Sequence, residues 1–134
     1  MVILDTSVAL SWCFEDEWTE PTQKILKHVE KHGAIVPALW QLEVTNALST
    51  SMRKKRLDVE KSRSYIRLFN ALPIKILSNS YDLSHLLDTA CSTGLTTYDT
   101  VYLLLAIEHH LPLATLDVAL QKAAQSKGVV VFNP

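Results

Sequence analysis

The sequence predicts an α/β protein whose parallel sheet is covered by helices on both faces. Short, apolar, mostly β-branched stretches recur along the chain, as expected of buried strands. Longer segments with helical spacing of apolar residues separate these stretches. A length of 134 residues and a hydrophobic content of 48% fit one domain, 1–134, with a real core. Alternating strands and helices within one domain indicate a parallel sheet between two helical layers.

Five stretches have the length and composition of buried strands. They are residues 2–4, 34–37, 74–77, 113–116 and 129–132. Helical spacing fills most of the chain between them, in residues 20–32, 40–55, 58–71, 82–93, 99–110 and 117–127. The apolar faces of the first three helices are predicted to contain Ile25, Leu26 and Val29; Leu42, Ala47 and Leu48; and Tyr65, Ile66, Leu68 and Phe69.

The three glycines restrict both the fold and the chemistry. Gly33, Gly94 and Gly128 each follow a helical segment, where glycine readily adopts the left-handed conformation that ends a helix. No glycine remains for a Walker phosphate loop or a G-x-G-x-x-G turn. ATP and NAD chemistry are therefore disfavoured.

Composition narrows the class of protein further. The longest apolar stretch, 101–107, is too short to span a membrane, and the start of the chain lacks the features of a signal peptide, so we expect a cytoplasmic protein. Cys13 and Cys91 lie in apolar helical patterns without a C-x-x-C partner, which predicts buried thiols. A formal net charge of −1 argues against nucleic-acid binding by bulk charge, although it permits a local basic face.

Four acidic residues draw attention, and three of them stand where strands end or helices begin. Asp5 directly follows the first predicted strand, and Asp117 follows the fourth. Asp99 lies in the first turn of a helix with Thr97 as its candidate N-cap, and Glu43 lies one turn into another helix. Ligands of open α/β sheets bind at the carboxyl ends of the strands, so this placement indicates a functional site.

Each acid also has a simpler interpretation. Helix dipoles favour acids in first turns, which explains Asp99 and Asp117 without any chemistry. Glu43 could be a solvated helical residue. Asp5 is harder to explain this way, because a serine or threonine would cap the next helix at lower desolvation cost. The functional interpretation therefore depends on the four residues together.

Three segments of the sequence resemble the PIN domain, and in particular the VapC toxins of bacterial VapBC toxin–antitoxin pairs. The resemblance covers nearly the whole chain and is carried by VILDTSVALSWCFEDE, LEVTNAL and TTYDTVYLLLAIEHHLPLATLDVAL. It implies a PIN-like three-layer α/β/α fold with a central five-stranded parallel sheet. It also implies a metal-dependent endoribonuclease with Asp5, Glu43, Asp99 and Asp117 as its acidic residues, a homodimer, and a small VapB-like antitoxin that blocks the cleft.

Electrostatics favours a metal ion at the same residues. Two carboxylates about 4 Å apart repel by about 4 kcal/mol at an effective dielectric constant near 20, so the six pairs among four converging acids cost roughly 20 kcal/mol. Oxygen ligands suit Mg²⁺ or Mn²⁺, which would relieve that repulsion. We expect Asp5 and Asp99 to bind the ion, and Glu43 and Asp117 to complete its ligands or orient the attacking water. Hydrogen bonds to these acids are expected from Ser7 and Thr115.

RNA needs positive charge beside such an acidic cleft. The densest basic run contains Arg53, Lys54, Lys55 and Arg56, and is followed by Lys61, Arg63 and Arg67. Two interpretations stay open for it, contact with RNA phosphates and a solvated helix end whose cations offset the dipole. The tryptophans could stack on bases, but the apolar neighbours of Trp12 and Trp40 favour a place in the protein body or in a partner groove.

Other classes fit less well. A two-component receiver domain needs a paired acid at the first site and a lysine near the end of the last strand, and this chain offers neither. A haloacid-dehalogenase-type phosphatase needs D-x-D after its first strand, but the third position of that motif is Ser7 here. The serious alternative is a catalytically weak or inactive PIN-like module that binds RNA or protein.

Residues 99–110 are apolar almost all round, which predicts one face against the sheet and another against a second chain.

Overall fold

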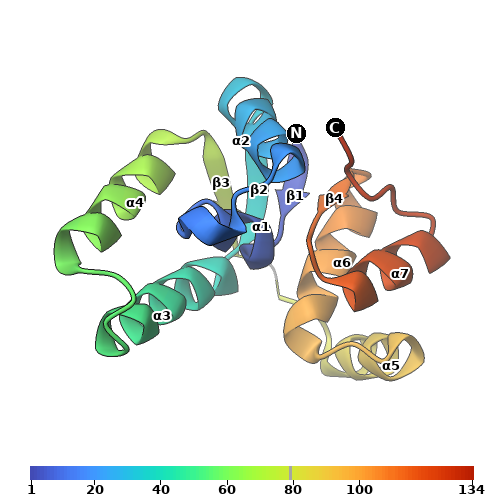
Figure 1. Cartoon of the computed structure of the whole chain (residues 1–134). Coiled ribbons are helices and arrows are strands. Elements are labelled where there is room, and N and C mark those ends of the chain that lie inside the picture. Colours follow the sequence, from blue (N-terminus) through green and yellow to red (C-terminus); the bar gives the residue numbers. More distant parts are fainter. Residues whose placement is uncertain (79) are drawn as a thin grey trace.

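The computed structural model describes residues 1–78 and 80–134, and it confirms the predicted α/β class (Figure 1). The elements in chain order are β1 (Val2–Leu4), α1 (Thr6–Ser11), the 3-10 turn η1 (Glu15–Glu17), α2 (Glu20–His32), β2 (Ala34–Pro37), α3 (Leu39–Arg53), α4 (Val59–Ala71), β3 (Ile74–Leu77), α5 (Leu83–Thr93), α6 (Thr97–His109), β4 (Leu113–Ala114) and α7 (Val118–Ser126). The sequence pattern did not delimit α1 or η1, because both are too short to show a helical period.

The sheet is parallel, with the strand order β3-β2-β1-β4. The prediction of five strands is wrong for the described residues, which form four. Residues 129–132 contribute only an isolated bridge between Val131 and Leu113. The neighbouring strand β4 is two residues long, so it gives this segment almost nothing to pair with.

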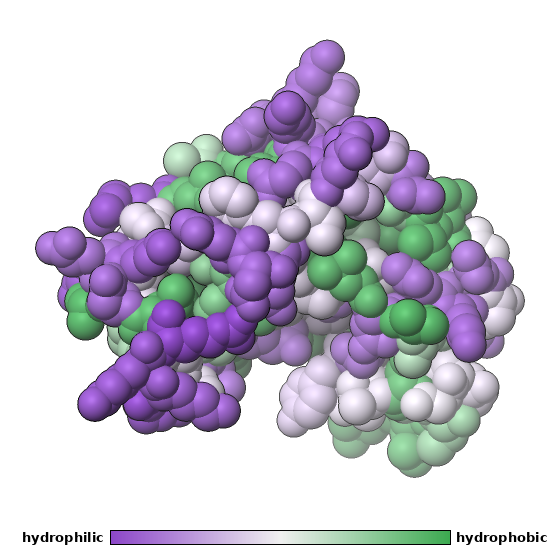
Figure 2. Space-filling view, in the orientation of Figure 1, coloured by the Kyte–Doolittle hydropathy of each residue, from purple (hydrophilic) through white to green (hydrophobic). Residues whose placement is uncertain are grey.

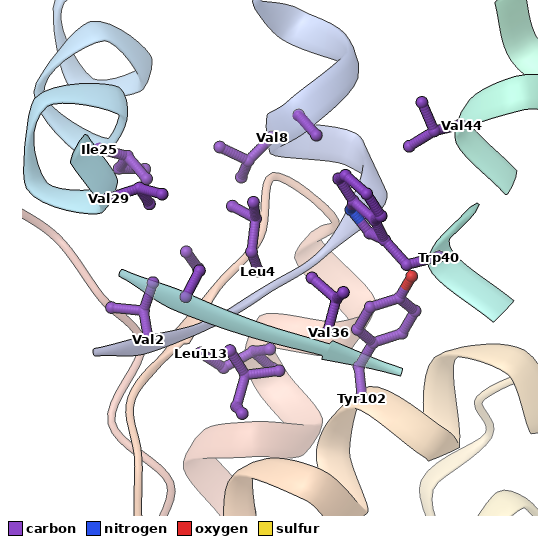
Figure 3. Packing of buried hydrophobic residues seen from close by; sticks show 14 of the residues in the cluster. Val2, Leu4, Val8, Ile25, Val29, Val36, Trp40, Val44, Tyr102 and Leu113 are labelled. Atoms are coloured by element: carbon purple, nitrogen blue, oxygen red, sulfur yellow. The ribbon is translucent and has the colours of Figure 1, made fainter. Parts of the chain in front are cut away.

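Helices cover the two faces of the sheet. Figure 3 shows Val8 of α1 with Ile25 and Val29 of α2 on one side of the strands, and Tyr102 of α6 on the other. α6 contacts β1, β2 and β4. The strands run downward in Figure 1, and α1, α3, α6 and α7 begin near or below their lower ends. Four helix starts therefore meet the carboxyl ends of the strands.

Several predicted burial patterns need correction. Leu42 is 72% exposed, because the buried face of α3 carries Trp40, Val44 and Leu48 at four-residue spacing and a residue two positions on from Trp40 points away. The edge strand β3 is not fully buried: Lys75 and Ile76 are exposed, and Ile74 and Leu77 are partly buried. Cys91 is exposed, whereas Cys13 is buried and burial raises the pKa of its thiol to about 12.

The apolar character of α6 is explained within this chain. Leu103 and Leu105 are fully buried, and the helix packs against the sheet, α5 and α7. The predicted contact between this helix and a second chain stays a prediction. Across the described residues, no helix has the length and apolarity that crossing a membrane requires.

Candidate acidic site at the carboxyl ends of the strands

The four predicted acids lie on elements that meet at one edge of the sheet. Asp5 follows β1, Glu43 lies in the α3 helix that follows β2, and Asp117 follows β4. Asp99 lies in the first turn of α6. Figure 2 shows the surface notched at this lower edge, between the lobe of α3 and the lobe of α5 and α6.

Asp5 is held by hydroxyl groups from two different elements. It is only 5% exposed and occupies the N-cap position of α1, yet its side chain makes no capping bond within the described residues. Its Oδ2 accepts hydrogen bonds from Ser7 Oγ and from Thr115 Oγ1, both at 2.7 Å. In the described part of the chain, Oδ1 has no hydrogen-bond partner, so one oxygen is anchored and the other is available.

The same hydroxyls connect Asp5 to the start of α7. Thr115 Oγ1 also accepts a hydrogen bond from the backbone N–H of Asp117, at 3.1 Å. Ser7 Oγ accepts one from the N–H of Leu116, at 3.0 Å. The parallel pairing of β1 with β4 makes these contacts possible, because it brings the residue after each strand to the same height. Asp5 and Asp117 are therefore linked through Thr115.

Glu43 is held in a similar way by two residues for which the sequence suggested no role. Its Oε1 accepts hydrogen bonds from Tyr102 Oη at 2.6 Å and from Thr6 Oγ1 at 3.0 Å. Tyr102 is completely buried, and its ring lies beside Val36 (Figure 3). A signal was present, since Tyr102 lies three residues after Asp99 and hence on nearly the same helix face. The apolar residues around Tyr102 predict only packing, so the sequence did not indicate its hydrogen bond to Glu43.

The remaining two acids are held locally by helix starts. The N-cap of α6 is Thr96 and not the predicted Thr97, since Thr96 Oγ1 accepts the backbone N–H of Asp99 at 3.2 Å. Asp117 is itself the N-cap of α7, with Oδ1 accepting the N–H of Leu120 at 3.1 Å. The capping interpretation thus describes one oxygen of Asp117, whereas another residue caps the helix of Asp99.

Electrostatics shows that three of the acids act on the fourth, Asp99. Burial raises the pKa of Asp99, and the negative charges of Asp5 and Asp117 raise it further; Glu43 adds a smaller effect. A hydrogen bond with Thr96 opposes these effects. Burial, followed by the hydrogen bond to Glu43, raises the pKa of Tyr102, so its hydroxyl stays protonated and can donate. The negative charges of Asp5, Glu43 and Asp117 therefore all act on Asp99.

Comparison with known proteins identifies the family of the chain. The sequence profile of the PIN domain matches residues 2–125. The chain belongs to the PIN domain family. PIN domains are generally nucleases, and they typically use divalent metal ions.

Two solved structures resemble this PIN domain. PAE2754 from Pyrobaculum aerophilum has a TM-score of 0.72 and 27% identity, covering 97% of this chain and 82% of its own. FitAcB from Neisseria gonorrhoeae has a TM-score of 0.68 and 21% identity, covering 100% of this chain and 98% of its own, which supports the fold alone. No curated protein sequence matches the chain significantly.

The residues of this PIN domain fit a hydrated metal ion better than a tight cage. Among residues 1–78 and 80–134, no three His, Cys, Asp or Glu side chains form a preassembled metal site. Mg²⁺ keeps several waters and needs only one or two protein carboxylates. The oxygens left over on Asp5, Glu43 and Asp117 suit that kind of binding.

The predicted basic run forms the turn between α3 and α4, and part of it binds acids of the same chain. Arg56 lies 4.0 Å above the ring centre of Phe14 and forms ion pairs with Asp16 at 3.3 Å and Glu17 at 3.9 Å. These contacts attach η1 to the α3–α4 turn. Arg56 therefore has a structural role here.

The other predicted RNA-contact residues are oriented differently. Arg53 donates to Ser49 Oγ at 2.8 Å and to Thr50 Oγ1 at 3.1 Å, which are contacts within its own helix. Lys54 and Lys55 are exposed after the end of α3. The surface at the lower left of Figure 2, where the α3–α4 turn lies in Figure 1, is strongly hydrophilic. These two lysines are the best placed of the basic run to meet an external anion.

The tryptophans are placed mainly for packing. Trp12 and Trp40 are buried, with ring centres 6.4 and 5.6 Å from that of Phe69. Trp18 is half exposed, and its Nε1 donates to the carbonyl of Trp12 at 3.0 Å. Base stacking by Trp12 or Trp40 would require both to leave the core.

Proposed function

We propose that this PIN domain, spanning 1–134, is a Mg²⁺-dependent endoribonuclease of the VapC toxin type. One observation carries the proposal. Asp5 is buried at the end of β1 with one oxygen held by two hydroxyls, and its charge acts on Asp99 together with those of Asp117 and Glu43. Burying a carboxylate among three others is costly unless a cation binds there.

The chain's own residues would divide the work as follows. Asp5 and Asp99 would hold Mg²⁺, or Mn²⁺ in its place, and Glu43 and Asp117 would complete the ligands or orient the attacking water. Ser7 and Thr115 would fix the carboxylate of Asp5. When bound, the ion supplies a water of lowered pKa and positive charge beside the phosphate oxygens.

RNA contact is proposed for the basic turn as well. Lys54 and Lys55 would neutralise phosphates directly, with Arg53 beside them. Arg56 would contribute mainly by holding the turn in shape, because its charge is already paired with η1. The proposed substrate is an RNA strand that lies along the notch between the α3 lobe and the α6 lobe.

An antitoxin partner is supported by the chemistry of the rim. Exposed apolar side chains adjoin three of the acids in sequence: Leu42 beside Glu43, Tyr98 beside Asp99, and Leu116 beside Asp117. An acidic centre with an apolar rim suits a peptide that carries both cationic and apolar residues, as a small VapB-like antitoxin could. The proposed homodimer rests on the resemblance to VapC toxins, and so does the proposed cytoplasmic location.

The direct test is RNA cleavage by the purified chain. We expect cleavage with Mg²⁺ or Mn²⁺, no cleavage in EDTA, and recovery when the metal is returned in excess. Internal cuts in a circular RNA would establish that the enzyme is an endonuclease. Equal cleavage with and without EDTA would overturn metal dependence.

A second candidate is a catalytically weak or inactive PIN-like module that binds RNA or protein. It is favoured by the lack of a preassembled metal site among the described residues. The two candidates differ in one experiment. A binding module would retain RNA in a filter assay but leave it uncut at saturating Mg²⁺, whereas the enzyme would release shorter fragments.

A further inference from the structure

Three side chains from three helices meet in a closed triangle of hydrogen-bonding groups. Tyr102 Oη of α6 lies 2.6 Å from Glu43 Oε1 of α3, and Thr6 Oγ1 of α1 lies 3.0 Å from the same oxygen. The two hydroxyl oxygens are 2.8 Å apart. Thr6 and Tyr102 are both buried, so water cannot easily replace either of them.

The number of hydrogens determines how this triangle is bonded. Each hydroxyl has one hydrogen to donate, and an ionised carboxylate can only accept. The arrangement that satisfies the charge has both hydroxyls donating to Oε1 of Glu43. In the described part of the chain, Oε2 of Glu43 has no hydrogen-bond partner. One oxygen is thus anchored and the other is left for an external ligand.

Asp5 repeats this pattern with other residues. Its Oδ2 takes hydroxyls from Ser7 and Thr115, and its Oδ1 takes none from the described residues. Two carboxylates on different elements are therefore each fixed through a single oxygen by a pair of hydroxyls. Hydrogen bonds that served only to stabilise the fold would have no reason to leave one oxygen without a partner in both carboxylates.

We propose that Thr6 and Tyr102 are positioning residues, which hold Glu43 through Oε1 and thereby present Oε2 to a divalent ion. This inference rests on the proposed metal-dependent function. Residues that orient a metal ligand typically change metal affinity 10- to 100-fold when they are removed. Because α6 also carries Asp99 one turn before Tyr102, the same helix supplies an acid and the hydroxyl that orients another acid.

The test is a Mn²⁺ titration of the full chain, in which electron paramagnetic resonance measures the concentration of the free ion. Tyr102→Phe keeps the ring and removes only the hydroxyl, and it should raise the Kd for Mn²⁺ about tenfold. Tyr65→Phe, at a buried tyrosine on α4, is the matched control and should leave the Kd unchanged. Thr6→Val should weaken binding severalfold, whereas Thr6→Ser keeps a hydroxyl and should restore it.

A double-mutant cycle separates positioning from general stability. In a Glu43→Gln background, Tyr102→Phe should cause no further loss of Mn²⁺ affinity, because the hydroxyl acts through Glu43. Additive losses, or a Tyr102→Phe variant that melts earlier in EDTA with an unchanged Kd, would overturn the positioning role. The Thr6 pair keeps the test decisive should Tyr102→Phe fail to fold, since equal Kd values for Thr6→Val and Thr6→Ser would also overturn it.

Failure of the proposed function gives a different result. If the wild-type chain neither binds Mn²⁺ nor cuts RNA, both proposals fall together. If the wild type binds Mn²⁺ and cuts RNA while all the hydroxyl variants match it, only the positioning role is overturned.

Discussion

The two halves of the acidic site are held in contrasting ways. Asp5 and Glu43 each depend on at least one hydroxyl that is distant in sequence: Thr115 lies 110 positions after Asp5, and Tyr102 lies 59 positions after Glu43. Asp99 and Asp117 depend on contacts three residues away, at the starts of their own helices. The first pair is therefore in place only when the whole chain is folded, whereas the second needs only α6 and α7.

This contrast explains why a single acid could not be interpreted alone. The helix dipole alone accounts for an acid at the start of a helix, so an acid in that position is weak evidence for a functional site. Two hydroxyls from separate elements on one carboxylate oxygen are costly to arrange by chance, because each loses conformational freedom on ordering. The hydroxyl-held acids therefore carry more of the functional inference than the helix-start acids.

The largest effect is expected at a hydroxyl-held acid. Asp5→Asn should reduce Mg²⁺-dependent RNA cleavage by on the order of a hundredfold or more, about 2.7 kcal/mol of activation free energy. The fold should survive, because the amide oxygen can still accept from Ser7 and Thr115. Asp88→Asn, the same change at an exposed residue of α5, is the matched control and should keep wild-type activity. Full activity of Asp5→Asn in a nuclease-free preparation would refute the assignment.

The next effect asks whether both kinds of acid serve one ion. Mg²⁺ at ten times its Kd should raise the free energy of unfolding by about 1.4 kcal/mol, which is a few degrees in melting temperature. Asp99→Asn should reduce this shift, although Asp99 belongs to the helix-start pair. Thermal melts with EDTA and with Mg²⁺ measure it. An undiminished shift in Asp99→Asn would separate Asp99 from the metal site.

A smaller effect concerns the capping of α6. Thr96→Ala removes the side chain that accepts the N–H of Asp99 and should cost about 1 kcal/mol in the free energy of unfolding. Thr97→Ala, one residue later, should cost only a few tenths by the same measure, because Thr97 is not the N-cap. Urea unfolding of the two variants compares them. Equal costs would mean that Thr96 does not cap the helix in solution.

The smallest effect is a pH dependence in metal-free protein. The pKa of Asp99 in the folded chain is raised above its ordinary value of 3.8, so its charged form destabilises the fold at neutral pH. As the pH falls through the raised pKa, the folded chain takes up a proton first and this cost disappears. In EDTA at pH 7, the melting temperature of Asp99→Asn should therefore equal that of the wild type or exceed it by about one to two degrees. The two should converge toward pH 4, and a variant that melts earlier at pH 7 would indicate a plain helix-stabilising acid.

Much of the fold could be predicted from local pattern. The positions of β1, β2 and β3 followed from short, apolar, mostly β-branched stretches. The long helices followed from apolar spacing, since each of them is long enough to show its period. The fifth strand was wrong, because pairing depends on a neighbouring strand and β4 ends after two residues. The buried face of α3 was misassigned because the sequence does not say which side of the helix meets α1 and α4.

The candidate site could be predicted in part, for a related reason. Asp5, Ser7, Thr115 and Asp117 come shortly after strands, and Glu43 lies in the helix that follows β2, so the rule for parallel sheets brings them to one edge. Asp99 follows α5 and not a strand, so this rule does not place it. Thr6 and Tyr102 lie inside apolar stretches, and their function is visible only in the triangle with Glu43. The choice between Thr96 and Thr97 as N-cap depended on one residue of helix boundary, which sequence patterns rarely resolve.

The short helix α1 makes the site unusually sensitive to chain length. Asp5, Thr6 and Ser7 are consecutive, and they supply one acid, a hydroxyl for Glu43 and a hydroxyl for that same Asp5. Inserting one residue after Asp5 would turn the following helical residues by about 100°. Thr6 and Ser7 would then both point elsewhere, and two carboxylates would lose their orientation at once. Length variation among related chains should therefore be tolerated in surface turns but not in this segment.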